Sequence, residues 1–291
     1  MQNQNGAAPA AQTIDGVLRR GREVLSQCSS TPRLDAEILL AHVLGMERSA
    51  LLARPTGILD AAADLTYTAL VERRTHGEPI AYLTGHKEFY DLDLFITSDV
   101  LVPRPETESV VEACLAALPP SGRCTFADIG TGSGAILVAV TNRRPELCSY
   151  ATDISPEAIA VARQNCDRYN ITDRVRLYVG HLCDPLPEPV NVLAANLPYV
   201  SPGEASPDVA TWEPSVAVFG GGDDGSALIR QFLAQAPRYL LPGGTIVMET
   251  AHSQGAIVSQ LAADAFPLAE VTVHKDLAGY DRIVIIRDSR T

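Results

Sequence analysis

Residues Asp128–Ala135 read Asp-Ile-Gly-Thr-Gly-Ser-Gly-Ala and lie between two apolar runs. Glycines permit a tight turn and close approach of a ligand to the backbone, and the N–H groups at a helix start attract an anion. Two cofactors fit such a turn. A dinucleotide would place its pyrophosphate there, since Gly130-x-Gly132-x-x-Ala135 satisfies a relaxed fingerprint, and S-adenosylmethionine would place its carboxylate there. A purely structural turn is the alternative. The residues expected to contact a cofactor are Asp128, Gly130, Thr131, Gly132, Ser133 and Gly134.

Asp153 ends a predicted strand about 20 residues beyond this turn, where a carboxylate can accept hydrogen bonds from both ribose hydroxyls of a nucleotide. Ser155 is expected to cap the helix that begins at Pro156, which leaves Asp153 for the ribose. Asp128 discriminates between the two cofactors. A carboxylate before the turn repels a pyrophosphate, and it suits the ammonium and sulfonium charges of S-adenosylmethionine. These charges favour S-adenosylmethionine.

The segment Asn196-Leu197-Pro198-Tyr199 follows the apolar run Val190–Ala195. It is therefore predicted at the carboxyl end of a strand, where open α/β sheets bind ligands. Pro198 favours an extended Leu197, whose carbonyl then points outward. The Asn196 side-chain oxygen and the Leu197 carbonyl can both accept hydrogen bonds from one NH₂ group, and Tyr199 offers a flat face to a planar amide or base. An ordinary turn is the alternative.

A scaffold of alternating strands and helices is predicted beyond Cys124. The strands are expected at Thr125–Ile129, Tyr150–Asp153, Val175–Tyr178, Val190–Ala195, Gly244–Glu249, Ala269–His274 and Arg282–Ile286. The helices are expected at Gly134–Asn142, Pro156–Asn170, Ser226–Leu241 and Ser253–Ala265. This alternation indicates a parallel sheet with helices on both faces. No helix-length segment separates the last two strands, so we expect a final hairpin that inserts one antiparallel strand.

The first part of the chain is predicted to be helical. One apolar stripe at helical spacing follows the start signal Thr31-Pro32 and consists of Leu34, Ile38, Ala41 and Leu44. We expect a disordered tail at residues 1–12, a helical bundle at 13–76, a β-hairpin and linker at 77–105, and a second domain at 106–291.

The composition narrows the class of protein. The chain has 23 Lys and Arg against 35 Asp and Glu, a net charge of −12, which disfavours stable binding of nucleic acid. The six cysteines include no Cys-x-x-Cys pair and the six histidines form no ligand-spaced cluster, so we expect free thiols and no metal site. The apolar runs fall short of the ~20 residues of a membrane helix, and the start lacks a signal-peptide pattern. We expect a cytoplasmic monomer that does not bind membranes.

The glycine turn followed by Asn-Leu-Pro-Tyr resembles the signature of methyltransferases that modify planar NH₂ nitrogens. Three further segments resemble the HemK/PrmC family of peptide chain release factor N5-glutamine methyltransferases: Gly77–Gly85, Glu88-Phe89 and Val100–Glu108. The last of these contains the run Arg-Pro-Glu-Thr-Glu. Residues Leu34–Leu40 and Glu213–Gly225 also match, so the resemblance extends from about residue 34 to the end of the chain.

This resemblance implies a class I methyltransferase fold, a Rossmann-like seven-stranded sheet, with a small N-terminal helical domain that recognises the substrate. It implies S-adenosylmethionine as cofactor, S-adenosylhomocysteine as product, and release factors as partners methylated on the glutamine of their GGQ motif. The resemblance assigns catalysis and substrate binding to Asn196, Leu197, Pro198 and Tyr199, with Asn196 also at the cofactor. It assigns further substrate contacts to Arg104 and Glu106, and the cover of the adenine ring to Leu182.

The sequence departs from that family at two positions. Leu197 stands where the family has a proline, but the backbone carbonyl is retained, so we expect the function to be retained. His181 stands where the family has an acidic residue that contacts the adenine amino group. We expect His181 on the solvent side rather than at the ligand.

Four alternative functions follow from the same residues. The first is a glutamine methyltransferase of a ribosomal protein, whose family lacks the run at residues 104–108. The second, a nucleic-acid adenine N6 methyltransferase, is disfavoured by the negative charge. The third, a nicotinamide-dependent oxidoreductase, is disfavoured by Asp128 and the Asn196 turn. The fourth is a binding module that keeps both loops without turnover.

Overall fold

The computed structural model describes residues 12–120, 122–276 and 278–290, and it divides the chain into two compact units, Met1–Gly85 and His86–Thr291. The predicted tail lies outside the described residues except for Gln12. That residue pairs with Leu59 in a short antiparallel contact between β1 (Gln12–Thr13) and β2 (Ile58–Leu59). None of the helices in the described part of the chain is both long and apolar enough to cross a bilayer.

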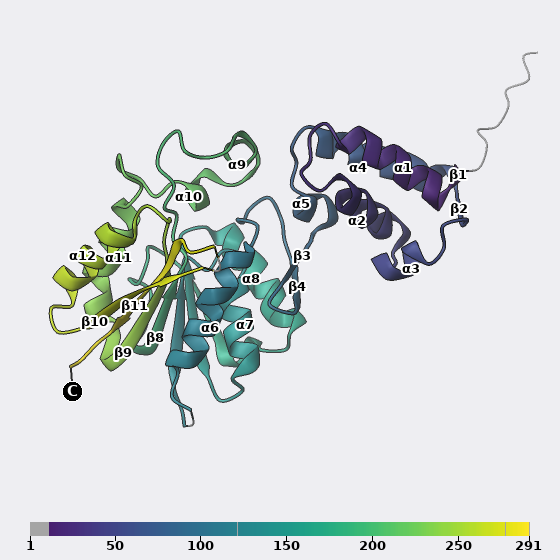
Figure 1. Ribbon diagram of the computed structural model, residues 1–291. Helices are drawn as coiled ribbons and strands as arrows, with labels where there is room; N and C mark the ends of the chain where they lie inside the picture. The colour runs from purple at the N-terminus through teal and green to yellow at the C-terminus, as the bar shows by residue number, and fades with distance from the viewer. Residues whose placement is uncertain (1–11, 121, 277, 291) are drawn as a thin grey trace, which may run out of the picture. The chain divides into compact units, whose positions relative to one another are not determined.

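The first unit is a helical bundle, as the spacing of apolar residues predicted (Figure 1). Its helices are α1 (Ile14–Leu25), α2 (Pro32–Leu44), α3 (Arg48–Leu52), α4 (Ala61–Thr75) and α5 (Ile80–Thr84). Side-chain oxygens of Thr13 and Asp60 cap α1 and α4, and Gly45, at φ 60°, ends α2. Leu83 of α5 belongs to the bundle core, so the unit reaches Gly85, beyond the predicted limit at residue 76.

The buried face of α2 differs from the predicted stripe. Leu34 is 37% exposed, whereas Leu39 and Leu40 are fully buried. Helix α2 packs against α1, α4 and α5, which cover more than one side of it. The buried surface therefore spreads around the helix, and a single i, i+4, i+7 stripe does not describe it.

The second unit is built on a seven-stranded sheet with the order β10-β11-β9-β8-β5-β6-β7. Its strands are β5 (Thr125–Ile129), β6 (Cys148–Asp153), β7 (Val175–Val179), β8 (Val190–Ala195), β9 (Leu240–Glu249), β10 (Glu270–Lys275) and β11 (Asp281–Arg287). Strands β5 to β9 pair in parallel, and β11 runs antiparallel to both of its neighbours. The predicted Rossmann-like sheet with one inserted antiparallel strand is confirmed.

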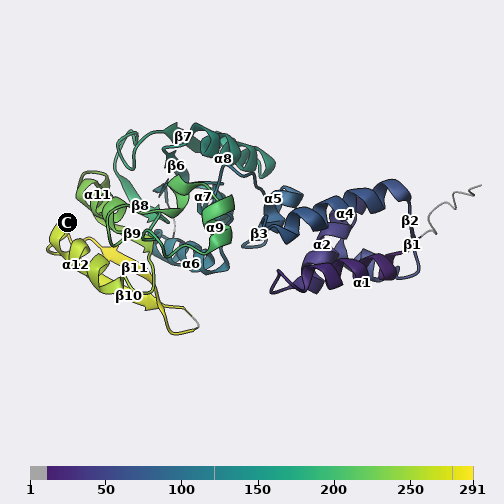
Figure 2. The same ribbon diagram turned by 90° about the horizontal axis from the view of Figure 1, so that it is seen from above.

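Helices cover both faces of this sheet, as Figures 1 and 2 show. One face carries α6 (Glu108–Ala117), α7 (Ala135–Arg143) and α8 (Pro156–Arg168), and the other carries α11 (Ala227–Gln235) and α12 (Gly255–Ala265). Two short helices, α9 (Pro207–Trp212) and α10 (Ser215–Val218), follow β8. Two of its 3₁₀ turns lie at Pro105–Thr107 and Thr172–Arg174.

Helix α11 is shorter than the sequence predicted. It ends at Gln235, and a 3₁₀ turn, Ala236–Arg238, leads to β9 at Leu240. Pro237 lies in this turn, and proline has no N–H to continue an α-helix. The predicted helix to Leu241 and the predicted strand start at Gly244 are therefore both wrong.

The predicted β-hairpin forms from β3 (His86–Phe89) and β4 (Leu92–Phe95) and belongs to the second unit. The Asn165 side chain of α8 holds it, because its Oδ1 accepts from the Phe95 N–H at 2.7 Å and its Nδ2 donates to the Phe95 carbonyl at 2.9 Å. The same Nδ2 donates to the Ser133 carbonyl at 2.8 Å. Asn165 thereby links the hairpin to the glycine turn.

Candidate active site

A cavity of about 170 Å³ lies at the carboxyl ends of β5, β6 and β8. The predicted site residues that line it are Arg104, Gly130, Thr131, Gly132, Ser133, Asp153, Leu182, Asn196, Leu197 and Pro198. Those outside its lining are Glu106, Asp128, Gly134 and Tyr199. The topology thus brings together the two turns that the sequence singled out, because parallel strands end at the same edge of a sheet.

Backbone hydrogen bonds shape the glycine turn. The N–H groups of Gly130 and Thr131 donate to the Thr152 carbonyl at 2.9 and 3.0 Å, and the Gly134 N–H donates to the Thr131 carbonyl at 2.8 Å. Gly134 has φ 81°, and a Cβ on it would lie 3.2 Å from the Ala162 Cβ of α8. Some of the N–H groups predicted to meet an anion are therefore used within the protein. The start of α7, whose first N–H groups have no partner within the helix, remains the place for an anionic group.

Asp153 ends β6 and faces the turn. Its Oδ2 accepts from the Gly132 N–H at 2.9 Å and its Oδ1 accepts from the Ser155 N–H at 3.0 Å. Ser155 caps α8, since its Oγ accepts from the Ala158 N–H at 3.0 Å, as predicted. Burial raises the pKa of Asp153, while the hydrogen bonds from Ser155 and Gly132 oppose this shift. Each carboxylate oxygen has a further lone pair, so Asp153 can still accept from ribose hydroxyls.

Asp128 lies beneath the turn and is 1% exposed. Its Oδ2 accepts from the Thr131 hydroxyl at 2.7 Å and from the Leu137 N–H of α7 at 3.2 Å. Its Oδ1 is buried and has no hydrogen-bond partner among the described residues. Burial raises the pKa of Asp128 to about 7. Asp128 therefore links the glycine turn to α7 by hydrogen bonds. It does not line the cavity, so its charge would influence a bound cofactor without direct contact.

Leu182 and His181 line the cavity together. Leu182 has φ 48°, an uncommon value for a branched residue, and its carbonyl accepts from the Thr152 hydroxyl at 2.8 Å. The His181 Nε2 lies 3.0 Å from the Gln231 Oε1. His181 thus lines the cavity beside Leu182, while its ring takes part in a solvent-exposed hydrogen bond, and the expectation that it is not a ligand contact stays a prediction.

Asn196 lies at the centre of a hydrogen-bond network. Its Nδ2 donates to the Thr107 Oγ1 and to the Glu249 Oε2, both at 3.1 Å. Glu249 ends β9 and is 2% exposed, and the Thr107 hydroxyl donates to its Oε2 at 2.7 Å. Sequence reasoning missed Glu249 and Thr107. Glu249 ends a predicted strand, as Asp153 does, and this shared position is the signal that could have found it.

Tyr199 is held away from the first cavity. Its hydroxyl donates to the Glu249 Oε1 at 3.0 Å, and its carbonyl accepts from the Gln254 Nε2 at 3.0 Å. Burial and the neighbouring Glu249 raise the pKa of Tyr199, so its phenol stays protonated. The ring is positioned by these contacts, and it lines a second cavity of about 210 Å³.

This second cavity adjoins the first, since Arg104, Asn196, Leu197 and Pro198 line both. The Arg104 guanidinium forms an ion pair with the buried Glu213. Glu106, predicted at the substrate, is exposed and lines neither cavity, whereas its neighbour Thr107 is buried and lines the first. The two cavities thus meet at the Asn196–Pro198 turn, one on the side of the glycine turn and one on the side of Tyr199.

The donor set suits an organic nucleoside rather than a metal. Within residues 12–120, 122–276 and 278–290, no group of three or more His, Cys, Asp or Glu could hold a metal ion. A Cβ added to Gly132 at its φ of 55° would meet no atom within 4 Å, so the turn leaves open space beside the cavity. Asp153 at the end of β6 fits the ribose of a nucleoside, and the glycine turn after β5 fits an anionic group.

Comparison with known families finds two domains that correspond to the two compact units of the structure. Residues 16–85 match the PrmC N-terminal domain, and residues 92–282 match a methyltransferase domain. The crystal structure of a methyltransferase from Pyrococcus furiosus has a TM-score of 0.53 at 20% identity and covers 77% of this chain and 98% of its own. That likeness shows the fold, which is the predicted class I methyltransferase fold.

Curated relatives match over nearly the whole chain. A release factor glutamine methyltransferase from Coxiella burnetii is 38% identical over 265 residues, 90% of this chain and 94% of its own length. One from Nitratidesulfovibrio vulgaris is 37% identical over 290 residues, 97% and 98% of the two chains. One from Moorella thermoacetica is 41% identical over 256 residues, 86% and 89%. With both domains matched and the two turns joined at one cavity, the chain belongs to the release factor glutamine methyltransferase family.

Proposed function

We propose that this protein transfers the methyl group of S-adenosylmethionine to the side-chain amide nitrogen, N5, of the glutamine in the GGQ motif of peptide chain release factors. The relatives that carry the release factor name support this substrate. The single observation that carries the chemistry is the orientation of Asn196. Its NH₂ group is committed to Thr107 and Glu249, which leaves its Oδ1 as an acceptor for a substrate NH₂ group.

The first cavity offers the groups that a nucleoside cofactor with a carboxylate requires. Asp153 would accept from the ribose hydroxyls, the start of α7 would take the carboxylate, and Leu182 would cover the adenine. When bound, S-adenosylmethionine supplies an electrophilic methyl group on a sulfonium. When ionised, above its pKa of about 7, Asp128 adds a negative charge beneath the turn that favours a cationic ligand.

Catalysis then depends on alignment rather than on a strong base. An amide nitrogen is a weak nucleophile because its lone pair is delocalised. The Asn196 Oδ1 and the Leu197 carbonyl accept from the substrate NH₂ group and hold its nitrogen in line with the methyl group. The same two acceptors favour the positive charge that develops on nitrogen, and the proton leaves afterwards.

The first unit is proposed to bind the release factor. Its match to the PrmC N-terminal domain and its separate core support a role apart from the cavity of the second unit. Release factors act in translation, so the proposed place of action is the cytoplasm.

Incubation with labelled S-adenosylmethionine and a purified release factor tests the function. Mass spectrometry should locate one added methyl group on the glutamine of the GGQ motif. A release factor with that glutamine replaced by alanine is the control and should stay unlabelled. In parallel incubations with ribosomal proteins and with DNA, label on a ribosomal protein or on adenine, with none on the release factor, would overturn the proposed substrate.

A further inference from the structure

We propose that Glu249 is a positioning residue, which fixes the orientation of the Asn196 carboxamide and so presents Oδ1 to the substrate amide. This inference rests on the function proposed above, because it assigns Oδ1 to the binding of that amide. Glu249 lies on β9 and Asn196 follows β8, the neighbouring strand of the sheet, where Ala195 pairs with Met248.

The Glu249 carboxylate collects hydrogen bonds from three side chains. Its Oε2 accepts from the Thr107 hydroxyl at 2.7 Å and from the Asn196 Nδ2 at 3.1 Å, and its Oε1 accepts from the Tyr199 hydroxyl at 3.0 Å. An ionised carboxylate can only accept hydrogen bonds, so this pattern is that of the anion. The contacts join both polar ends of the Asn196–Tyr199 turn to one buried charge.

These contacts decide which end of the Asn196 carboxamide faces Glu249. The Thr107 hydroxyl uses its hydrogen on Glu249, so its oxygen can only accept from Asn196. Both neighbours of the carboxamide are therefore acceptors. A flipped carboxamide would set its oxygen against the Glu249 carboxylate in a buried site, which leaves two acceptors without a donor. The NH₂ group must face Glu249, and the oxygen must face away from it.

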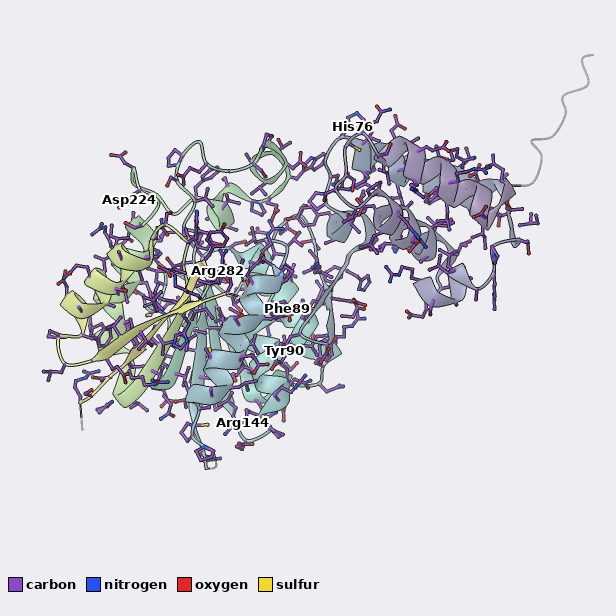
Figure 3. All side chains as sticks on the ribbon, in the orientation of Figure 1. His76, Phe89, Tyr90, Arg144, Asp224 and Arg282 are labelled. Carbon is purple, nitrogen blue, oxygen red and sulfur yellow. The ribbon has the colours of Figure 1, made fainter. Side chains whose placement is uncertain are left out.

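Opposing effects act on the protonation of Glu249. Burial is the largest of them and raises the pKa of Glu249 above its ordinary value, whereas the hydrogen bonds from Thr107 and Tyr199 and the charge of Arg282 lower it, and the exposed Glu106 raises it. Arg282, which is labelled in Figure 3, is the second residue of β11, and its carbonyl accepts from the N–H of Thr250, the residue after Glu249. The positive charge of Arg282 thus lies near the end of β9, where it favours the ionised carboxylate.

Substitution of Glu249 and Asn196, singly and together, tests this assignment in the full-length protein. In Glu249→Gln, one acceptor oxygen replaces two and an NH₂ group is introduced, so the Asn196 carboxamide loses its fixed orientation. We expect kcat on the release factor to fall about 10- to 100-fold, by analogy with the groups that orient the ligands of metal sites. The Kd of S-adenosylhomocysteine, measured by calorimetry, should stay within about twofold, because Glu249 does not line the first cavity.

The kcat of the double variant distinguishes positioning from stability, because a residue that only stabilises the fold would not restore activity to Asn196→Asp. Asn196→Asp places two carboxylates against each other and should lower kcat about 100- to 1,000-fold. When Glu249→Gln is added to Asn196→Asp, the NH₂ group introduced at position 249 can donate to one carboxylate oxygen at position 196. The other oxygen at position 196 then faces the substrate amide as an acceptor. We expect the double variant to exceed Asn196→Asp alone by at least about tenfold in kcat. A double variant no more active than Asn196→Asp would overturn the proposal.

Two further variants separate positioning from stability. Asp288→Asn changes another buried carboxylate, paired with Arg290 at the far end of β11, and should lower the melting temperature without changing kcat. Thr107→Val keeps the shape of the side chain, removes the hydroxyl between Asn196 and Glu249, and should lower kcat about 10-fold. It serves as the test if Glu249→Gln does not fold. Wild-type kcat in either Glu249→Gln or Thr107→Val would overturn the proposal.

The activity of the wild-type protein tells a failure of the proposed function from a failure of the positioning role of Glu249. A wild-type protein that leaves the release factor glutamine unlabelled would overturn the proposed function and this inference with it. An active wild type, an inactive Asn196→Ala variant and an unimpaired Glu249→Gln variant would overturn the positioning role alone.

Discussion

The Asp153 Oδ2 accepts a hydrogen bond of 2.9 Å from the Gly132 N–H, so the carboxylate that ends β6 also holds the turn that follows β5. The residue expected to take the ribose therefore also sets the shape of the neighbouring anion site. A substitution at Asp153 should affect both parts of the cofactor, and a substitution in the turn should disturb the carboxylate.

Asp153→Ala is predicted to weaken cofactor binding. It removes a charged acceptor from the cavity and frees the Gly132 and Ser155 N–H groups. A hydrogen bond to a charged group contributes about 1.5–3 kcal/mol, so the Kd of S-adenosylhomocysteine should rise roughly 10- to 150-fold in calorimetry. Asp60→Ala, which removes the cap of α4 in the first unit, is the control and should bind as the wild type does. Unchanged affinity in Asp153→Ala would remove Asp153 from the site.

Asn196→Ala is predicted to lower kcat on the release factor by about 10²- to 10³-fold, because one preorganised acceptor is lost. The Kd of S-adenosylhomocysteine should change much less than kcat, because the lost acceptor is proposed to hold the substrate amide, even though Asn196 also lines the first cavity. Steady-state kinetics and calorimetry on the same preparation check both expectations. Wild-type turnover would mean that the substrate amide is held by other groups.

Leu197→Pro is predicted to retain most activity and to lose stability. The methyltransferase signature that this turn resembles has proline at this position, and proline keeps the carbonyl that is proposed to bind the substrate amide. Leu197 is 4% exposed, and a Cβ on Gly130 would lie 3.0 Å from its Cδ2, so its side chain packs over the turn. Loss of that packing should cost about 1–3 kcal/mol in the free energy of unfolding, with kcat within a few fold. Complete loss of activity in a folded variant would show that the backbone here differs from the family's.

Asp128→Asn is predicted to change how stability depends on pH. Burial raises the pKa of Asp128 to about 7, well above its value in an unfolded chain. Between about pH 4 and pH 7 the folded protein keeps a proton that the unfolded chain has released, so this group lowers stability as pH rises through that window. The variant lacks this effect. From about pH 5 to about pH 8, the free energy of unfolding of Asp128→Asn should gain about 3 kcal/mol relative to the wild type. If denaturation curves give the same difference in free energy of unfolding between Asp128→Asn and the wild type at every pH in this range, the raised pKa of Asp128 is contradicted.

A chain of residues 86–291 is predicted to bind S-adenosylhomocysteine like the full chain and to methylate an intact release factor poorly. Each unit has its own cluster of buried apolar residues, and the first cavity is lined by residues of the second unit. Calorimetry measures the Kd of S-adenosylhomocysteine, and steady-state kinetics measure kcat/KM on the release factor. Equal kcat/KM with and without residues 1–85 would contradict a recognition role for the first unit.

Local patterns were enough to predict the sheet and the place of the site. The strand before the glycine turn and the strand before Asn196 are buried apolar runs, and polar residues at their carboxyl ends must meet. The Glu249 network could not be predicted from spacing, because Thr107, Asn196 and Glu249 come from three distant segments. The buried face of α2 was missed for a related reason, since its neighbours α1, α4 and α5 decide which side is covered.

The position of β11 bears on the order in which the protein can assemble during synthesis. Residues 281–287 insert between β9 and β10, so β10 leaves the ribosome before its neighbour in the sheet exists. Strands β5 to β8, with the glycine turn and Asp153, can already pair by then. Arg282 reaches Glu249 and Tyr199 only with β11. A nascent chain can therefore form the proposed cofactor pocket first, and the charge environment of Asn196 is completed only when the last sheet strand arrives.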